Sequence, residues 1–358
     1  MARSEGGRLV YADLLRVAAM LAVIVIHVSA GWLESSPVGT ADWHALNTWD
    51  GLCRWAVPVF VMCSGMFLLD PKRSLPLPHL FLGHFLRMAA ALLVWGVAYH
   101  LLYQLLAGTL SLASIPYALY AVILGNTEAH LWYLITMMGL YLLTPLLRAF
   151  VRGASRGDFH WCFLIYGLFM LALPLFLRLR GSQTVALYAD RLSLNFTLAF
   201  PPLAYVGYFL AGYYLKTYTL GRLAEGIVYV LGIAGAVATV AGTTLLSHRA
   251  RGLDVTLYSY LTPNVAAMAV AVFVLFRYVL GISDERSRKQ RVSGMAACGF
   301  GVYLCHVVFL ILLRHFGLAI PPIPAAIGVP LLTLVIFVPS YALSWFIHKI
   351  PVVGRYLT

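Results

Sequence analysis

The sequence predicts an all-α fold, a polytopic bundle of about ten transmembrane helices that forms one integral-membrane domain over residues 1–358 without a soluble domain. Hydrophobic residues make up 61% of the 358 residues and charged residues only 11%. The mean hydropathy is +0.86, well above that of soluble domains. Apolar runs long enough to cross a bilayer alternate with Gly, Pro and charged residues. These predicted spans cover residues 9–32, 51–69, 80–107, 129–150, 160–178, 197–216, 226–246, 260–281, 295–315 and 324–348.

The distribution of positive charge predicts the orientation of these spans. With the N-terminus in the cytoplasm, 16 of the 25 Lys and Arg residues fall on the cytoplasmic side and 6 on the outer side. Because cytoplasmic loops carry an excess of Lys and Arg, we expect a multi-pass protein of the inner (plasma) membrane with both termini cytoplasmic. The positive-inside rule and contact with membrane lipids account for the net charge of +12. This charge therefore does not indicate a nucleic-acid partner.

Three further segments complete the map. Residues 111–124 form a shorter apolar run that either spans the membrane or lies at its interface; a spanning run would reverse all later helices and spoil the charge asymmetry. Residues 33–50 have no Lys or Arg and predict an outer loop, either a solvated connector or a wall of a substrate site. Residues 282–294 predict a basic cytoplasmic loop at the lipid headgroups.

The five cysteines have no metal-like spacing with histidine, and no metal site is predicted.

The first apolar run contains three ionisable residues, Asp13, Arg16 and His27. At about 100° per residue, Asp13 and Arg16 lie about 60° apart and Arg16 and His27 about 20° apart, so all three share one stripe of the helix. Two interpretations are open. Asp13 and Arg16 can pair across one turn while His27 bonds a neighbouring helix, or the stripe can be a functional polar track. The cost of ionisable groups at membrane depth favours the second.

A basic cluster near the inner end of the third run predicts a site for a cytosolic anion that carries phosphate. It comprises Lys72, Arg73, His84 and Arg87. For Arg87 the alternative is a side chain that extends to the headgroups.

On the outer half, Arg54, Glu128, His130 and Trp132 occur near helix ends where they can approach His27. His100 and His306 lie deeper, and a lone membrane histidine typically makes a hydrogen bond between helices. His306 is also a candidate substrate-binding residue, together with the first four.

Five motifs in order resemble the membrane-bound acyltransferase 3 family. The first motif resembles the family's first-helix signature Arg-x10-His: Asp13-Leu-Leu-Arg16 is followed by ten residues and then by His27. The other segments that resemble the family are PVFVMCSGMFLL (58–69), HLWYLITMMGLYLLTPLLR (130–148), YVGYFLAGYYL (205–215) and FGVYLCHVVFL (300–310). Together they cover nearly the whole chain.

The resemblance implies an O-acyltransferase that takes an acyl group from cytoplasmic acyl-CoA, typically an acetyl group from acetyl-CoA. The acceptor would be a hydroxyl of a surface glycan, a lipid-linked sugar or a related molecule. His27 would be the catalytic histidine and Arg16 its essential partner, oriented by Asp13. The family commonly has an Arg-x-x-Arg pair where this chain has His84-Phe-Leu-Arg87. A neutral His84 is a weaker ligand for the CoA phosphates than arginine.

Two alternatives stay open, one for the role of His27 in the reaction and one for the class of protein. Neutral His27 can act as general base on the acceptor hydroxyl or can accept the acyl group itself. The alternative class is a transporter or flippase for a lipid-linked or small anionic substrate, although the sequence has no inverted repeat or paired broken helices. The acceptor, the acyl length and the oligomeric state stay open.

Overall fold

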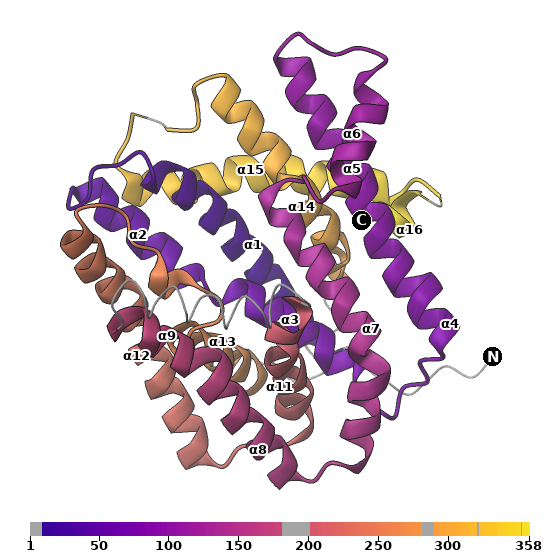
Figure 1. Cartoon of the computed structure of the whole chain (residues 1–358), viewed down its shortest axis with the longest axis vertical. Coiled ribbons are helices and arrows are strands. Elements are labelled where there is room, and N and C mark those ends of the chain that lie inside the picture. Colours follow the sequence, from indigo (N-terminus) through magenta and orange to yellow (C-terminus); the bar gives the residue numbers. More distant parts are fainter. Residues whose placement is uncertain (1–8, 181–200, 281–289, 321, 352) are drawn as a thin grey trace.

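The structure is a computed structural model that describes residues 9–180, 201–280, 290–320, 322–351 and 353–358. Over these residues the chain is helical and has no strands (Figure 1). Nine helices in the described part are long and apolar enough to cross a membrane, judged by length and composition. The predicted all-α, multi-pass membrane bundle is therefore confirmed for this part of the chain.

The helices follow one another with short connections. Those of the first half are α1 (Val10–Leu33), α2 (Ala41–Cys53), α3 (Ala56–Leu68), α4 (Leu77–His79), η1 (Leu80–Phe85), α5 (Leu86–Leu106), α6 (Ser114–Ile123), η2 (Ala129–Leu131), α7 (Trp132–Gly153), α8 (Arg156–Tyr166), η3 (Gly167–Ala172) and α9 (Leu173–Arg180). Those of the second half are η4 (Pro201–Tyr205), α11 (Val206–Thr217), α12 (Arg222–Ala250), η5 (Thr256–Tyr258), α13 (Pro263–Tyr278), α14 (Gln290–His315), α15 (Ala325–His348) and α16 (Val353–Leu357).

Nine of the ten predicted spans have a matching helix of sufficient length. Several of these combine neighbouring segments, as α2 with α3 and α4 with η1 and α5 do. The sixth predicted span, 197–216, begins outside the described residues, and its described part forms η4 and α11. The predicted basic loop at 282–294 also lies largely outside the described residues, and α14 has begun by Gln290.

The prediction of a loop over residues 33–50 is wrong, because most of this segment is helix α2. Thr40 caps the helix through a hydrogen bond that its hydroxyl accepts from the Trp43 backbone N–H, at 3.2 Å. Trp43, Leu46, Asn47 and Asp50 recur at helical spacing on one buried face. The acidic residues concealed this face from the sequence analysis, since Asp50 looked like a loop residue and is in fact fully buried.

The apolar run at 111–124 contains the ten-residue helix α6. Ten residues extend about 15 Å, half of what a bilayer core requires, so this helix is too short to span alone. It packs against α5, where Gly96 leaves room for Val122. Helix α6 and the adjoining end of α5 form a hairpin that extends beyond the rest of the bundle at the top of Figure 1.

Helix α1 lies in the middle of the bundle and contacts α2, α3, α13, α14 and α15. Its small and apolar residues Ala12, Leu15 and Ala19 are fully buried. Beside it, α3 and α11 approach so closely that backbone meets backbone. A Cβ on Gly65 would overlap the carbonyl group of Phe209, and a Cβ on Gly212 would overlap that of Met62.

Replacing either glycine of this contact should therefore destabilise the protein. Gly65→Ala or Gly212→Ala forces two backbones apart, and we expect a loss of about 1–3 kcal/mol, as in other overpacked cores. Thermal unfolding in detergent measures it. Gly226→Ala is the matched control, because Gly226 lies in α12 with no atom near its missing Cβ and alanine favours helix. Equal melting temperatures for all four proteins would contradict this account of the α3–α11 contact.

Candidate active site

A cavity of about 650 Å³ lies where α1, α3, α5, α7 and α14 meet. Its ionisable lining residues are Asp13, Arg16, Arg73, His84 and Arg87. These are all of the residues that the sequence analysis assigned to catalysis and donor binding except His27 and Lys72. The cavity also has an aromatic lining, made of Phe60, Phe67, Tyr133, Tyr141, Phe300 and Tyr303. Such a mixture of cations and rings suits an anionic ligand with an apolar arm.

At one end of the cavity, Asp13 and Arg16 form the ion pair expected across one helical turn, with 3.9 Å between Oδ1 and Nη1. Asp13 is buried, whereas the Arg16 side chain is 37% exposed. The guanidinium of Arg16 lies over the Phe67 ring, 4.9 Å from its centroid. The guanidinium of Arg73 lies over the same ring at 4.8 Å, so two cations from different segments meet around one side chain.

Arg87 supplies a third cation from α5. Its guanidinium lies 4.8 Å from the centroid of Phe300, and its Nη2 donates a hydrogen bond to the carbonyl oxygen of Thr358. Its Nε is buried and has no hydrogen-bond partner in the described part of the chain. A buried N–H without a partner is costly unless a ligand satisfies it. His84 lines the cavity nearby, with its ring 5.8 Å from that of Tyr141, while the Lys72 side chain is exposed outside it.

His27 lies beyond the cavity, in a cluster of three histidines behind Tyr303. Its ring centroid is 5.1 Å from that of His306 and 6.0 Å from that of His130. The rings of His130 and His306 are 5.2 Å apart. Tyr303 lines the cavity, and its ring is 5.6 Å from His130 and 6.1 Å from His306. Tyr303 thus stands between the cations and the histidines.

The hydrogen bonds of this cluster define which ring nitrogens carry protons. Nδ1 of His306 lies 2.7 Å from the carbonyl oxygen of Tyr303, and Nε2 of His130 lies 3.4 Å from that of Leu304. A carbonyl only accepts hydrogen bonds, so we assign the proton of each neutral ring to these nitrogens. Nε2 of His306 and Nδ1 of His130 are then bare acceptors. Both are buried without a hydrogen-bond partner among the described residues.

The prediction of an interhelical hydrogen bond is wrong for His306, because its bond remains within α14. His100 bonds outside its own helix, since its Nε2 lies 2.8 Å from the carbonyl oxygen of Asn126. Asn126 lies in the connection after α6, so this bond does not join two helices as predicted.

The remaining outer candidates make contacts of their own. Arg54 pairs with the buried Asp50, with 2.5 Å between Nε and Oδ1, and lies over the Tyr258 ring at 4.2 Å. Trp132 stacks on Tyr260 with 5.9 Å between centroids. Glu128 precedes η2 and is half-buried. No hydrogen bond or ring contact joins Arg54, Glu128 or Trp132 to His27 in the described part of the chain. Of the five outer candidates, His130 and His306 have rings next to that of His27, and Arg54 is close enough to act on it electrostatically.

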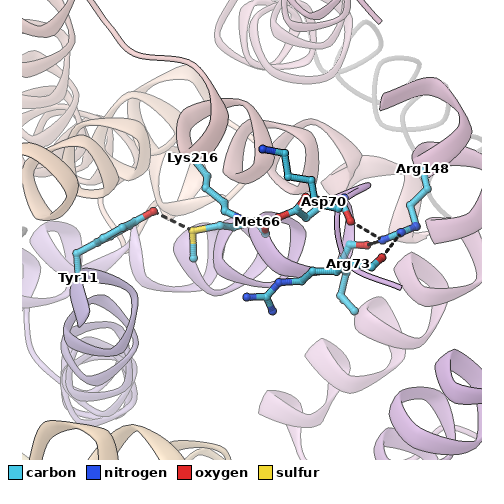
Figure 2. A network of polar contacts seen from close by, with 8 residues as sticks. Tyr11, Met66, Asp70, Arg73, Arg148 and Lys216 are labelled. Atoms are coloured by element: carbon cyan, nitrogen blue, oxygen red, sulfur yellow. Dashed lines mark hydrogen bonds and ion pairs between the residues drawn. The ribbon is translucent and has the colours of Figure 1, made fainter. Parts of the chain in front are cut away.

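The loop that carries Arg73 has a polar network that the sequence analysis missed (Figure 2). Asp70 pairs with Lys216 of α11 at 2.6 Å and accepts a hydrogen bond from the Lys72 backbone N–H at 3.0 Å. Arg148 of α7 donates to three backbone carbonyls of the same segment. In the sequence, Lys216 and Arg148 counted only as cytoplasmic positive charges. Their distance from this loop along the chain left no signal of the contact.

The described residues contain no group of three or more His, Cys, Asp or Glu side chains that could hold a metal ion.

The comparison with protein families agrees with the geometry. The chain belongs to the acyltransferase 3 family, since the family model, described as an acyltransferase domain, matches residues 9–349. The resemblance read from the five motifs is confirmed, and the protein is in general terms a membrane acyltransferase. The match does not support the alternative of a transporter or flippase. No curated protein and no solved structure matches the chain.

The pair of Asp70 and Lys216 predicts a pH-dependent stability. Burial alone would raise the pKa of Asp70, but the hydrogen bonds from Lys216 and from the Lys72 backbone together lower this pKa below its usual 3.8. A carboxyl with a lowered folded-state pKa stabilises the protein above 3.8 and loses this contribution as the pH falls further. Asp70→Asn should therefore lower the melting temperature at pH 7, and the difference from wild type should narrow below about pH 4.

Glu34→Gln, at an exposed position in the turn after α1, is the control and should show no such dependence. A melting difference for Asp70→Asn that stays constant from pH 7 to acid would contradict the assignment.

Proposed function

We propose that the protein is an O-acyltransferase that takes an acyl group, acetyl in the simplest case, from cytoplasmic acyl-CoA. The acceptor is a hydroxyl of a surface glycan or of a lipid-linked sugar. The observation that carries the proposal is the cavity itself. Arg16, Arg73 and Arg87 line it together with aromatic rings, and one of these rings, Tyr303, also contacts the histidine cluster. Guanidinium groups are the usual protein ligands of phosphate.

The orientation follows from the charge asymmetry of the sequence. The segments that line the charged end of the cavity, around Leu9, Arg73 and Ala296, belong to ends that the positive-inside rule assigns to the cytoplasm. In the inner membrane, with both termini cytoplasmic, the cavity is accessible to cytosolic acyl-CoA. The acceptor approaches from the other side, where Trp132 and Tyr260 form an aromatic wall beside Arg54 suited to a sugar ring with polar edges.

In the proposed reaction, the phosphates of the donor bind the arginines and the pantetheine arm runs past Phe67 and Tyr133 towards Tyr303. Neutral His27 takes the proton of the acceptor hydroxyl while the hydroxyl oxygen attacks the thioester carbonyl carbon. Collapse of the tetrahedral intermediate breaks the carbon–sulfur bond, and the departing thiolate takes the proton from His27. In the described part of the chain no hydrogen bond joins His27 to the bare nitrogens. In the proposed reaction the His27 ring turns so that Nε2 of His306, whose ring is the nearer of the two at 5.1 Å, accepts its N–H. This bond orients the His27 ring and stabilises the imidazolium, as the third member of a catalytic triad does.

Two variants, Arg87→Ala and His27→Ala, should affect donor binding and the chemical step separately. Arg87→Ala removes a phosphate ligand, so we expect acetyl-CoA to bind about tenfold to a hundredfold more weakly. His27→Ala should keep donor binding and lower acyl transfer at least about a hundredfold, the usual contribution of a general base. Binding is measured by titration of detergent-purified protein and transfer by release of free CoA thiol. Arg152→Ala, which changes an exposed arginine away from the cavity, is the control.

Absence of saturable binding to the wild-type protein would contradict the donor assignment. Near-normal transfer by a folded His27→Ala protein would contradict the mechanism.

The role of His306 can be tested with two replacements of different chemistry. His306→Phe keeps a ring but has no nitrogen, so we expect kcat to fall about tenfold or more, the value of a hydrogen bond to a charged group, with the KM for acyl-CoA unchanged. His306→Gln has an amide oxygen that can accept from His27, and it should retain more activity than the Phe variant. A Gln variant no better than Phe, or a Phe variant with wild-type kcat, would argue against a role through His27.

A further inference from the structure

The loop between α3 and α4, residues 69–76, brings Arg73 to the cavity although half of its residues, Arg73 among them, are exposed. An exposed loop of this kind is usually mobile. Here two helices far apart in the sequence hold it. Lys216 of α11 binds the Asp70 carboxylate at 2.6 Å, and Arg148 of α7 binds the backbone, as Figure 2 shows.

The guanidinium of Arg148 makes three hydrogen bonds to this segment. Nη1 donates to the carbonyl oxygens of Leu68 at 2.7 Å and Asp70 at 3.0 Å, and Nη2 donates to that of Arg73 at 2.6 Å. The side chain reaches the loop from inside the bundle, since Arg148 is only 6% exposed. The Leu68 carbonyl belongs to the last turn of α3, where carbonyls lack helical partners and a cation is favourable.

The consequence for the cavity concerns the direction of Arg73. Its backbone carbonyl is tied to Arg148, and its guanidinium lies over Phe67 at 4.8 Å, on the same ring as Arg16 at 4.9 Å. Two guanidinium groups held near each other repel, so without an external hold the exposed Arg73 would move into solvent. The three bonds of Arg148 supply that hold.

We propose that Arg148 is a positioning residue for the acyl donor. By fixing the loop, it keeps Arg73 opposite Arg16, so that the two guanidinium groups converge on one phosphate group of acyl-CoA. This inference rests on the proposed function, because the ligand is the proposed donor. It adds a residue outside the cavity lining, whose effect on donor affinity passes through Arg73.

A double-mutant cycle distinguishes this role from a purely structural one. Arg148→Lys keeps the charge but lacks the planar fork that bonds three carbonyls, and we expect acetyl-CoA to bind about tenfold more weakly. Arg73→Ala should weaken binding at least as much. The double variant should bind no more weakly than Arg73→Ala alone, because Arg148 acts through Arg73. Arg152→Lys on the same helix is the matched control and should leave affinity unchanged.

Hydrogen exchange of residues 69–76 gives a second readout that needs no ligand. Exchange should rise in Arg148→Lys, while the melting temperature stays close to that of wild type because the Asp70–Lys216 pair remains. Should the Lys variant fail to fold, Arg148→Gln, with a single amide donor group, replaces it in the same cycle.

The outcomes separate the two proposals. Additive losses in the double variant, or unchanged affinity of Arg148→Lys beside a weakened Arg73→Ala, would overturn the positioning role and leave the proposed function intact. No saturable binding of acetyl-CoA to the wild-type protein would overturn both.

Discussion

A guanidinium group resting on an aromatic ring is the contact on which the architecture of the cavity depends. Arg16 and Arg73 lie over Phe67, and Arg87 lies over Phe300. The face of a ring compensates part of the cost of a cation in an apolar bundle without occupying its N–H donors. A close carboxylate partner neutralises the charge and occupies the donors, as Asp50 does for Arg54 at 2.5 Å. Among the cavity arginines Arg16 has such a partner in Asp13, but at 3.9 Å and with its own side chain 37% exposed. The cavity therefore retains positive charge that is available to a ligand.

This contact also explains how the chain departs from its family without losing the basic character of the site. Where the family commonly has a second arginine, this chain has His84, which lines the cavity but is a poor phosphate ligand when neutral. Arg73 lines the same cavity from the neighbouring loop, and Arg16 joins it from α1. Arg73 thus adds positive charge to the cavity where the histidine has none when neutral.

Much of the fold followed from composition and from the cost of charge in a membrane. The runs of apolar residues located the spans, and the unfavourable placement of Asp13, Arg16 and His27 identified the central helix. The failure at residues 33–50 had a physical cause, because Asp50 reads as a loop residue unless Arg54 is known to pair with it in the interior. The sequence alone does not show that the positive charge of Arg54 compensates the cost of burying Asp50, because this depends on the two side chains being in contact in the fold.

The candidate site likewise has a part that the sequence predicted and a part that it did not. Arg16, Arg73, His84 and Arg87 were predictable as one group because their segments end on the same side of the membrane. The meeting of His27 with His130 and His306 depends on the rotations of α7 and α14 about their axes, which side-chain packing decides. Arg148 was hidden for the same reason: its three acceptors are backbone carbonyls, and every residue type has one.

The separation of the cations from His27 is consistent with the proposed reaction. Arg16 lies eleven residues before His27 on α1, about 16 Å along the helix axis, and Tyr303 stands between the cavity and the histidines. A donor with its phosphates at one end needs an extended arm to bring a thioester to the other, and pantetheine is such an arm. If His27 lined the wide part of the cavity, water that enters with the phosphates would compete with the acceptor hydroxyl. Placing the histidine outside the cavity lining separates the base from this water, which favours transfer of the acyl group over its hydrolysis.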